Sequence, residues 1–169
     1  VYIKDSLNKY KPSLFARSII YKPKSLYNSR TQNASLNRLI SLGAIKFVKN
    51  RFEKAEADTN KLDVYYYLTP APKKSLQGLV DGFTKDNNYL GTQVSINWKN
   101  RNAFRDAEQL AVKIFAGFET SFGDSLRGNN NIRLGANASL SIPKYVIPFF
   151  RLKENNFYQP RTTFSLGYE

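Results

Sequence analysis

The spacing of hydrophobic residues changes once along the chain, near residue 72. Between residues 11 and 42 apolar side chains recur every three or four positions, whereas after Lys73 they alternate with polar ones. The first spacing is that of an amphipathic helix, and the second is that of a strand with one apolar face. We therefore predict an α+β protein in two parts, residues 1–72 and residues 73–169, joined at residues 70–74.

Two helices are predicted in the first part. Pro12 suits a helix N-terminus, with Phe15 and Ile19 on one face, and Pro23 should end that helix. A second helix fits residues 29–42, because Gly43 follows as a C-terminal stop. Its cap would be Asn28 or Ser29, and its apolar stripe Leu36, Leu39 and Ile40.

Two strands are expected to complete this part, at residues 45–52 and 62–68, across a polar turn at residues 56–61. The apolar positions of the first strand, Ile45, Phe47, Val48 and Phe52, change phase, which suggests a β-bulge. With a short strand at Tyr2-Ile3, the expected order is β-α-α-β-β.

About five strands of roughly ten residues are predicted in the second part. A weak first strand covers residues 76–85, and the last covers residues 162–168. Between them, the alternating apolar positions that form the candidate lipid-facing set are Val94, Ile96, Trp98, Leu110, Val112, Ile114, Ile132, Leu134 and Leu140.

Such alternation fits either a soluble β-sandwich or an outer-membrane β-barrel. In a sandwich the apolar face points into the core, whereas in a barrel it points to lipid and the polar face lines the lumen. Strand length and a polar face of Gly, Asn and Ser favour the barrel. Aromatic residues near strand ends suit an interfacial girdle: Tyr89, Trp98, Phe104, Phe118, Phe122, Tyr145, Phe149, Phe150, Phe157 and Tyr158.

The amino-acid composition excludes several kinds of catalytic and metal-binding chemistry. The chain has no Cys and no His, which excludes disulfides, thiolate or imidazole metal ligands, and Ser-His or Cys-His catalysis. No enzymatic function is expected. A formal charge of +13 indicates either a polyanionic partner or a solvated basic surface. No apolar run is long enough for a membrane helix, and no signal peptide is present. The start at Val1 and the absence of Met suggest a fragment of a longer chain.

Several short motifs resemble the BamA/TamA-like outer-membrane assembly factors. Their order carries the resemblance: Tyr89-Leu90-Gly91-Thr92, Arg101-Asn102-Ala103-Phe104, Ala107-Glu108-Gln109-Leu110, Ser141-Ile142-Pro143, Ile147-Pro148-Phe149 and Pro160-Arg161-Thr162-Thr163. The family-like turn residues are Asn102, Phe104 and Gln109. Upstream, residues 26–68 resemble a POTRA module, the periplasmic polypeptide-transport-associated repeat.

The resemblance implies a β-α-α-β-β POTRA module followed by antiparallel strands of a partial transmembrane β-barrel. It implies assembly or insertion of β-barrel proteins in the bacterial outer membrane, or translocation across it, with the module in the periplasm. The expected partners are unfolded outer-membrane client proteins and outer-membrane lipid, without cofactor, metal, nucleic acid or small-molecule substrate; accessory assembly subunits are left open. The candidate client-pairing edge is the first barrel strand, at Leu76, Gly78, Val80 and Gly82.

Several alternatives stay open at this stage. Gly78 and Gly82 either weaken that strand or sit where lumen packing is tight. The module either receives client chain or acts as a spacer. Basic residues such as Lys46, Lys49, Arg51 and Lys54 either approach an anionic membrane surface or form a solvated strand face.

One departure from the family pattern concerns the first turn, where Arg105-Asp106-Ala107 replaces the family's glycines. Arg127-Gly128 is interpreted as an ordinary polar loop. Two rival functions remain: a basic, aromatic-rich β protein that binds single-stranded nucleic acid, and an ordinary outer-membrane porin or transporter barrel.

Overall fold

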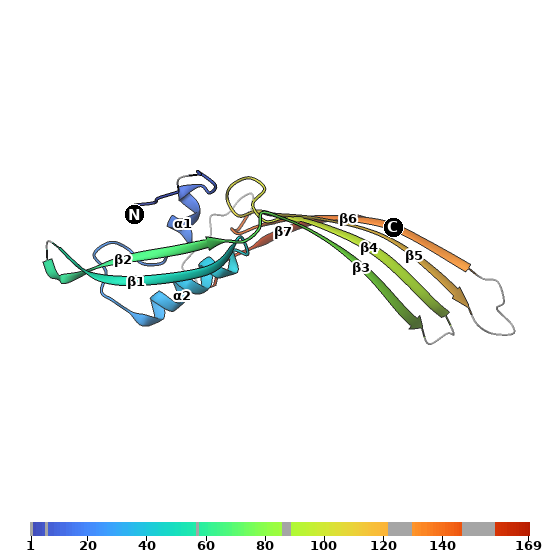
Figure 1. Ribbon diagram of the computed structural model, residues 1–169, viewed down its shortest axis with the longest axis horizontal. Coiled ribbons are helices and arrows are strands. Elements are labelled where there is room, and N and C mark those ends of the chain that lie inside the picture. The colour runs from blue at the N-terminus through green and yellow to red at the C-terminus, as the bar shows by residue number, and fades with distance from the viewer. Residues whose placement is uncertain (1, 6, 57, 86–88, 122–129, 147–157) are drawn as a thin grey trace. The chain divides into compact units, whose positions relative to one another are not determined.

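A computed structural model describes residues 2–5, 7–56, 58–85, 89–121, 130–146 and 158–169 (Figure 1). Two short helices precede strands that pair antiparallel wherever a register is defined, so the α+β class is as predicted. The elements are α1 (Pro12–Ser18), α2 (Ser29–Ser41), β1 (Ile45–Ala55), β2 (Asp58–Pro70), β3 (Lys74–Lys85), β4 (Tyr89–Asn100), β5 (Gln109–Ser121), β6 (Asn130–Ile142) and β7 (Thr162–Tyr168).

The chain divides into two compact units. The first consists of Val1–Lys73, Arg101–Glu108 and Ile142–Thr162, and the second of Lys74–Asn100, Gln109–Ser141 and Thr163–Glu169. The sequence pattern has a single boundary near residue 72. In the structure, the turns that follow β4 and β6 belong to the first unit, because their contacts are with its helices and N-terminal segment.

In the first unit, α1 is shorter than predicted. It ends at Ser18, and the extended backbone of Ile19 follows it, several residues before Pro23. The second helix has the predicted cap, since the Asn28 side chain accepts hydrogen bonds from the backbone N–H groups of Arg30 and Thr31. Gly43 has φ 69°, the left-handed conformation that a helix C-terminal stop requires.

The core of this unit is small, and α2 faces it differently from the prediction. The core residues are Leu14, Phe15, Leu39, Leu42, Ala44, Ile45 and Ala107. Leu39 is fully buried, but Ile40 is about half exposed, so the predicted apolar stripe is wrong at Ile40. The buried side of α2 also includes Ala34 and Ser35, whose small side chains permit close packing.

The predicted strand at Tyr2-Ile3 is wrong. Both residues are exposed and lie outside any strand, and in the described part of the chain the sheet of this unit contains only β1 and β2. Two apolar residues are too short a signal to distinguish a strand from an exposed terminal segment. The observed order is therefore α-α-β-β.

Strands β1 and β2 pair antiparallel over nearly their whole length. The register shifts between Ile45 and Phe47, so the predicted bulge is confirmed at Lys46. The predicted turn at residues 56–61 is too long, because β2 already begins at Asp58. Asp58 is the register partner of Ala55, and the register shifts between Lys54 and Ala55.

In the part of the chain that the structure describes, the second unit is a single sheet of five strands, in the order β3-β4-β5-β6-β7. For these residues the number of strands agrees with the prediction. The four strands β3 to β6 are 12 or 13 residues long, and their registers run without interruption. The two edges of the sheet are β3 and β7.

No helix formed by the described residues is long and apolar enough to cross a membrane.

Candidate functional site

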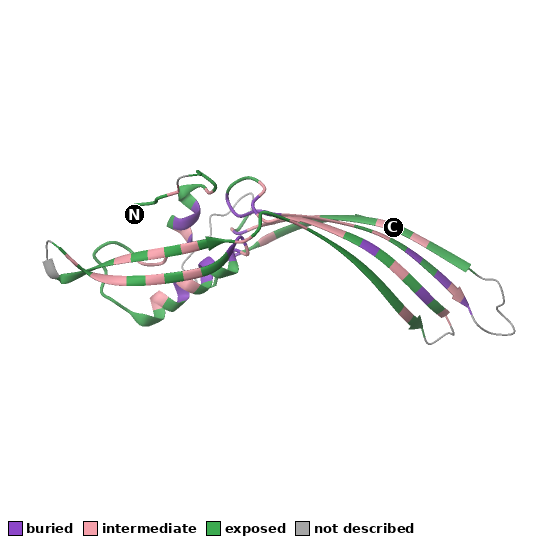
Figure 2. Cartoon of the chain, in the orientation of Figure 1, coloured by how far each residue is buried: buried purple, intermediate pink, exposed green. Residues whose placement is uncertain are grey.

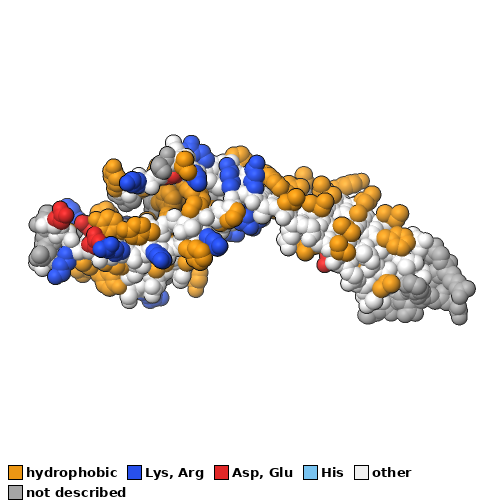
Figure 3. Space-filling view, viewed as in Figure 1, with side chains coloured by type: hydrophobic (Ala, Val, Ile, Leu, Met, Phe, Trp, Pro, Cys, Tyr) orange, Lys and Arg blue, Asp and Glu red, His pale blue; other side chains and the backbone are white. Residues whose placement is uncertain are grey.

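One face of the five-stranded sheet is apolar, and it is the exposed face. The registers align Trp98 with Val112, Ile96 with Ile114, and Ala116 with Leu134, so these side chains share one side. All nine residues of the candidate lipid-facing set lie on it: Val94, Ile96, Trp98, Leu110, Val112, Ile114, Ile132, Leu134 and Leu140. Leu134 is 64% exposed, and Figure 3 shows hydrophobic side chains over these strands with little charge among them.

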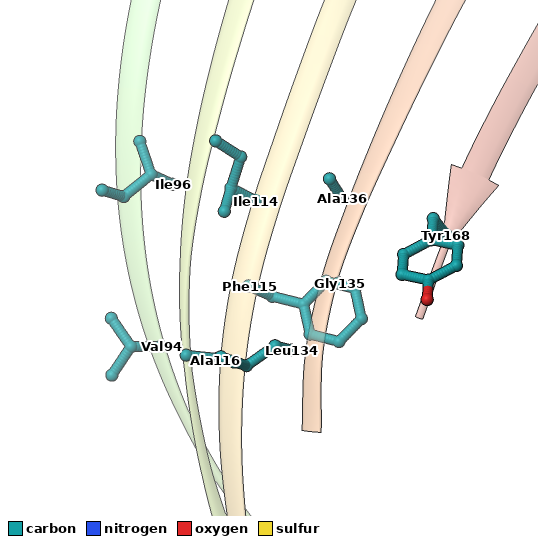
Figure 4. Close-up of a pocket in the computed structure, with 9 residues that line it drawn as sticks. All are labelled: Val94, Ile96, Ile114, Phe115, Ala116, Leu134, Gly135, Ala136 and Tyr168. Atoms are coloured by element: carbon teal, nitrogen blue, oxygen red, sulfur yellow. The ribbon is translucent and has the colours of Figure 1, made fainter. Parts of the chain in front are cut away.

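The apolar face contains a shallow hollow of about 430 Å³ (Figure 4). Four strands contribute to its lining, which includes Val94, Ile96, Ile114, Ala116, Leu134, Ala136 and Tyr168. The small side chains of Ala116 and Ala136, set among larger ones, account for the depression. Its lining is almost wholly apolar, so the hollow suits hydrocarbon and offers no catalytic group.

The opposite face of the sheet is polar and less exposed. Ser95, between the exposed Val94 and Ile96, is only 1% exposed, and Glu119 is also buried. Figure 2 shows this alternation along β4 and β5. A soluble sheet buries its apolar face and exposes its polar face. Burial in this sheet is therefore the reverse of the soluble pattern.

An ion-pair network crosses the polar face at one end of the sheet. Both carboxylate oxygens of Glu119 accept hydrogen bonds from Lys85 Nζ, at 2.9 and 2.8 Å. Arg133 donates to Glu119 at 3.3 Å and also pairs with Glu169. The network links edge strand β3 to β5 and β6, so it holds the strands together where β3 ends.

Two aromatic rings lie over glycines on the polar face. An added Cβ at Gly91 would lie 2.4 Å from a ring carbon of Phe83, and one at Gly135 would lie 2.4 Å from a ring carbon of Phe115. Each aromatic residue is the cross-strand partner of its glycine. A side chain at either glycine would require the ring above it to move. This is the pairing by which aromatic residues cover strand glycines.

The candidate client-pairing residues lie on β3, at an edge of the sheet. Leu76, Gly78, Val80 and Gly82 share the apolar face, and Val80 is 74% exposed. An added Cβ at Gly78 or Gly82 would meet nothing within 4 Å. Tight packing therefore does not explain these two glycines, which contrast with Gly91. In the described part of the chain, no strand pairs with the outer side of β3.

The family-like turn is a closely built loop of the first unit. The Asn102 side chain accepts from the Ala107 N–H at 3.1 Å and donates to the Lys9 carbonyl at 2.9 Å. Glu108 accepts from the N–H groups of Phe104 and Asp106. Gln109, the first residue of β5, is buried, whereas the Phe104 ring is exposed.

The backbone of this loop is left-handed at two residues. Arg105 and Ala107 have φ 72° and 58°, a region that glycine adopts without strain. The segment Arg105-Asp106-Ala107 nevertheless forms a turn. A hydrogen bond from the Ala107 N–H to the Asn102 side chain and core contacts of Ala107 hold it.

Asp106 is a buried charge in this turn, and the sequence pattern does not predict its burial. Its carboxylate accepts a hydrogen bond from Arg17 at 2.7 Å and lies 4.0 Å from Lys144 Nζ. It therefore ties the turn to α1 and to the segment after β6. The only signal in the sequence was an acidic residue in a basic neighbourhood, which does not identify its partners.

The structure describes some, but not all, of the aromatic residues that are expected at strand ends. Tyr89 begins β4 and Trp98 lies two residues before its end, while Phe104 lies in the turn before β5. Phe118 lies within β5, and Tyr145 and Tyr158 lie in the connection between β6 and β7. Phe122, Phe149, Phe150, Phe157, Arg127-Gly128 and Ile147-Pro148 lie outside the described residues. A girdle role stays a prediction.

Among the residues that the structure describes, no group of three or more acidic, Cys or His side chains is placed to hold a metal ion. The acidic residues of the site instead pair with cations or with backbone N–H groups.

Of the comparisons with known proteins, only the one with solved structures gave a match. No family model and no curated protein matches the chain. Among solved structures, it is similar to the crystal structure of BamA from Haemophilus ducreyi lacking POTRA domains 1–3. The TM-score is 0.41 and the identity 17%, over 94% of this chain and 32% of that one. The chain thus spans about a third of that structure, and the functional proposal below rests on its own residues.

Proposed function

We propose that the second unit is part of an outer-membrane β-barrel whose apolar face contacts lipid. The observation that carries the proposal is the reversed burial of the sheet, with apolar side chains outside and polar ones sheltered. Large exposed apolar side chains lie on five strands: Leu76, Val80, Leu90, Val94, Ile96, Ile114, Phe118, Ile132, Leu134, Phe164, Leu166 and Tyr168. Burial of each in hydrocarbon is worth about 1.5–3 kcal/mol.

Strand length supports the same proposal. A strand of 12 residues extends about 40 Å, which becomes about 30 Å when it is tilted as in membrane barrels. That is the thickness of the hydrocarbon core of a bilayer. Soluble strands are usually shorter, about 5–6 residues.

We further propose that the chain takes part in assembly of other β-barrel proteins in the bacterial outer membrane. Its edge strand β3 would pair with strands of unfolded client proteins, because unpaired N–H and C=O groups at a membrane edge find no water. Two glycines that packing does not require would keep this strand weakly held. The first unit would lie in the periplasm and deliver clients. No catalysis and no cofactor is involved.

An ordinary porin or transporter barrel is the alternative that the same apolar face favours. Such a barrel needs lipid-facing strands but no strand that exchanges partners. The behaviour of β3 therefore discriminates between the two functions.

The proposal is tested by cysteine crosslinking in cells, since the chain has no cysteine of its own. Leu76→Cys and Val80→Cys on β3 should each crosslink to a client that carries a cysteine in its terminal strand. The matched control is Ile114→Cys, which is exposed on the same face but lies on interior strand β5. Crosslinks that are absent at β3, or equally strong at Ile114→Cys, would remove the assembly function.

A further inference from the structure

The β1–β2 sheet has a covered face and a bare face. Val48 is paired with Leu68, and both pack against the core of the first unit. Because strand side chains alternate, their neighbours Phe47, Lys49 and Tyr67 point to the opposite side. Phe47 and Tyr67 are 57% and 56% exposed. This outer face is therefore an open surface that carries large aromatic rings.

Aromatic and basic side chains are interleaved at one end of the outer face. Lys49 lies directly opposite Tyr67 in the register, and Lys46 Nζ lies 5.2 Å from the centre of the Phe47 ring. We call these four residues, Lys46, Phe47, Lys49 and Tyr67, the proximal patch. Rings of this kind favour the boundary between water and lipid, where Lys side chains also reach the headgroups.

The charge of the proximal patch is not cancelled locally. Residues 6–52 contain ten Lys and Arg and no Asp or Glu. The acidic residues of the outer face, Glu53 and Asp63, pair with each other in the register at the far end. They lie about 13 Å along the strand from Lys49, beyond the screening length at physiological salt. Arg51 is bound to Glu53 at 2.6 Å and adds little to the patch.

The basic end of the sheet is the end that is nearer in sequence to the proposed membrane strands. The patch lies at the start of β1 and the end of β2, and only residues 71–73 separate β2 from β3. Such a linker spans at most about 14 Å. The acidic pair, in contrast, lies near the β1–β2 turn, at the far end of the strands.

We infer that the proximal patch binds the phosphate headgroups of anionic phospholipids at the membrane surface. This inference rests on the proposed membrane function of the second unit and adds a second lipid contact, made by the first unit. Lys46 and Lys49 bind the phosphates, and the rings of Phe47 and Tyr67 lie at the interface. Of the four basic strand residues, the inference concerns Lys46 and Lys49, because Lys54 lies on the other face and Arg51 is paired with Glu53.

The test uses the full chain in vesicles and a fluorophore on a single cysteine. Thr69→Cys places the label beside Phe47, and Asp63→Cys places it at the far end of the same face. Quenching by lipids with a nitroxide on the headgroup is measured in phosphatidylcholine vesicles with and without phosphatidylglycerol. We expect phosphatidylglycerol to increase quenching at position 69 and not at position 63, with the increase lost at high salt.

The variant Lys46→Gln/Lys49→Gln should abolish the increase at position 69. The matched control, Lys22→Gln/Lys24→Gln, removes the same charge from an exposed loop and should keep it. Equal quenching at both positions, or no dependence on phosphatidylglycerol, would overturn the inference. A third result would also overturn it. In that result, Lys46 and Lys49 are needed for binding of a single-stranded oligonucleotide, but their replacement leaves the quenching in vesicles unchanged.

Failure of the proposed function gives a different result. A label at Leu134→Cys reports insertion through quenching by nitroxides on the acyl chains. Without that quenching the membrane proposal itself fails. With it, and without headgroup quenching at position 69, only the proximal patch is wrong.

Discussion

At the scale of single residues, Asp106 offers the clearest test of the first unit. Its buried carboxylate accepts a hydrogen bond from Arg17 at 2.7 Å, whereas Arg51 and Glu53 form an exposed pair of similar length. We predict that Asp106→Asn lowers the free energy of unfolding of the first unit by about 1.5–3 kcal/mol, as expected for a hydrogen bond to a charged group. Urea unfolding measures the change.

The matched control for Asp106→Asn is Arg51→Gln. Because exposed ion pairs contribute about 0–1 kcal/mol, this variant should unfold close to the wild type. Equal losses of unfolding free energy in the two variants would show that the buried pair of Asp106 and Arg17 stabilises the first unit no more than an exposed ion pair does.

Tyr10 predicts a dependence of stability on alkaline pH. Burial, and secondly the negative charge of Asp5, raise the pKa of Tyr10 above its ordinary value of 10.0, and its hydroxyl donates to the Ala44 carbonyl at 3.1 Å. The folded chain therefore keeps this proton at a pH where the unfolded chain has lost it. The stabilisation is present below pH 10 and is lost as the pH rises through the folded pKa.

The measurement for Tyr10 is the free energy of unfolding from pH 9 to pH 11.5, compared with that of Tyr10→Phe. The wild type should lose stability more steeply than the variant above pH 10. Parallel curves would mean that the Tyr10 hydroxyl does not contribute.

The identities of single residues predicted two local features of the first unit, the cap and the C-terminal stop of α2. Asn28 and Gly43 carry strong local signals, and the structure uses both as predicted. Arg105 and Ala107 could not be predicted, because their left-handed conformation is imposed by distant contacts such as Asn102 with Lys9. Local propensity alone argues against that conformation.

At the scale of elements, edge strand β3 is held unequally along its length. Near its end, Lys85 binds Glu119 and the Phe83 ring covers Gly91, whereas Leu76 and Gly78 near its start are exposed. We predict that Lys85→Gln speeds amide hydrogen exchange at residues 82–85 much more than at residues 75–78. Without the ion pair between Lys85 and Glu119, the end of β3 opens locally as readily as its start.

The conservative variant Lys85→Arg should restore slow exchange, because it keeps a cation within reach of Glu119. Hydrogen exchange measured by mass spectrometry on β3 peptides distinguishes the cases. Exchange that is equally fast at both ends of β3 in the wild type would rule out the unequal attachment.

Strand elements were easier to predict than helical ones. Strict alternation over β5 and β6 extends for more than ten residues, so the period is unambiguous. The short α1 and the apolar pair Tyr2-Ile3 offer only one or two spacings each. Tertiary packing decided both cases, ending the helix early and leaving the pair without a partner.

At the scale of the whole molecule, alternation predicted the two faces of the large sheet, and strand length and the composition of the polar face favoured an open apolar face. Alternation alone assigns Val94 and Ser95 to opposite sides without stating where solvent lies. The structure leaves the apolar side uncovered, and ion pairs and rings over glycine lie on the polar side. We propose a membrane as the surroundings of the uncovered side.

The central claim is that the apolar face contacts lipid, and a spin-label scan of β6 tests it most directly. Single cysteines are introduced at residues 131–140, omitting the ring-covered Gly135, and the full chain is placed in vesicles. Collisions with oxygen should dominate at Ile132, Leu134, Ala136, Ala138 and Leu140, and collisions with a water-soluble nickel complex at Asn131, Arg133, Asn137 and Ser139. Equal access of the nickel complex to both sets would contradict the account.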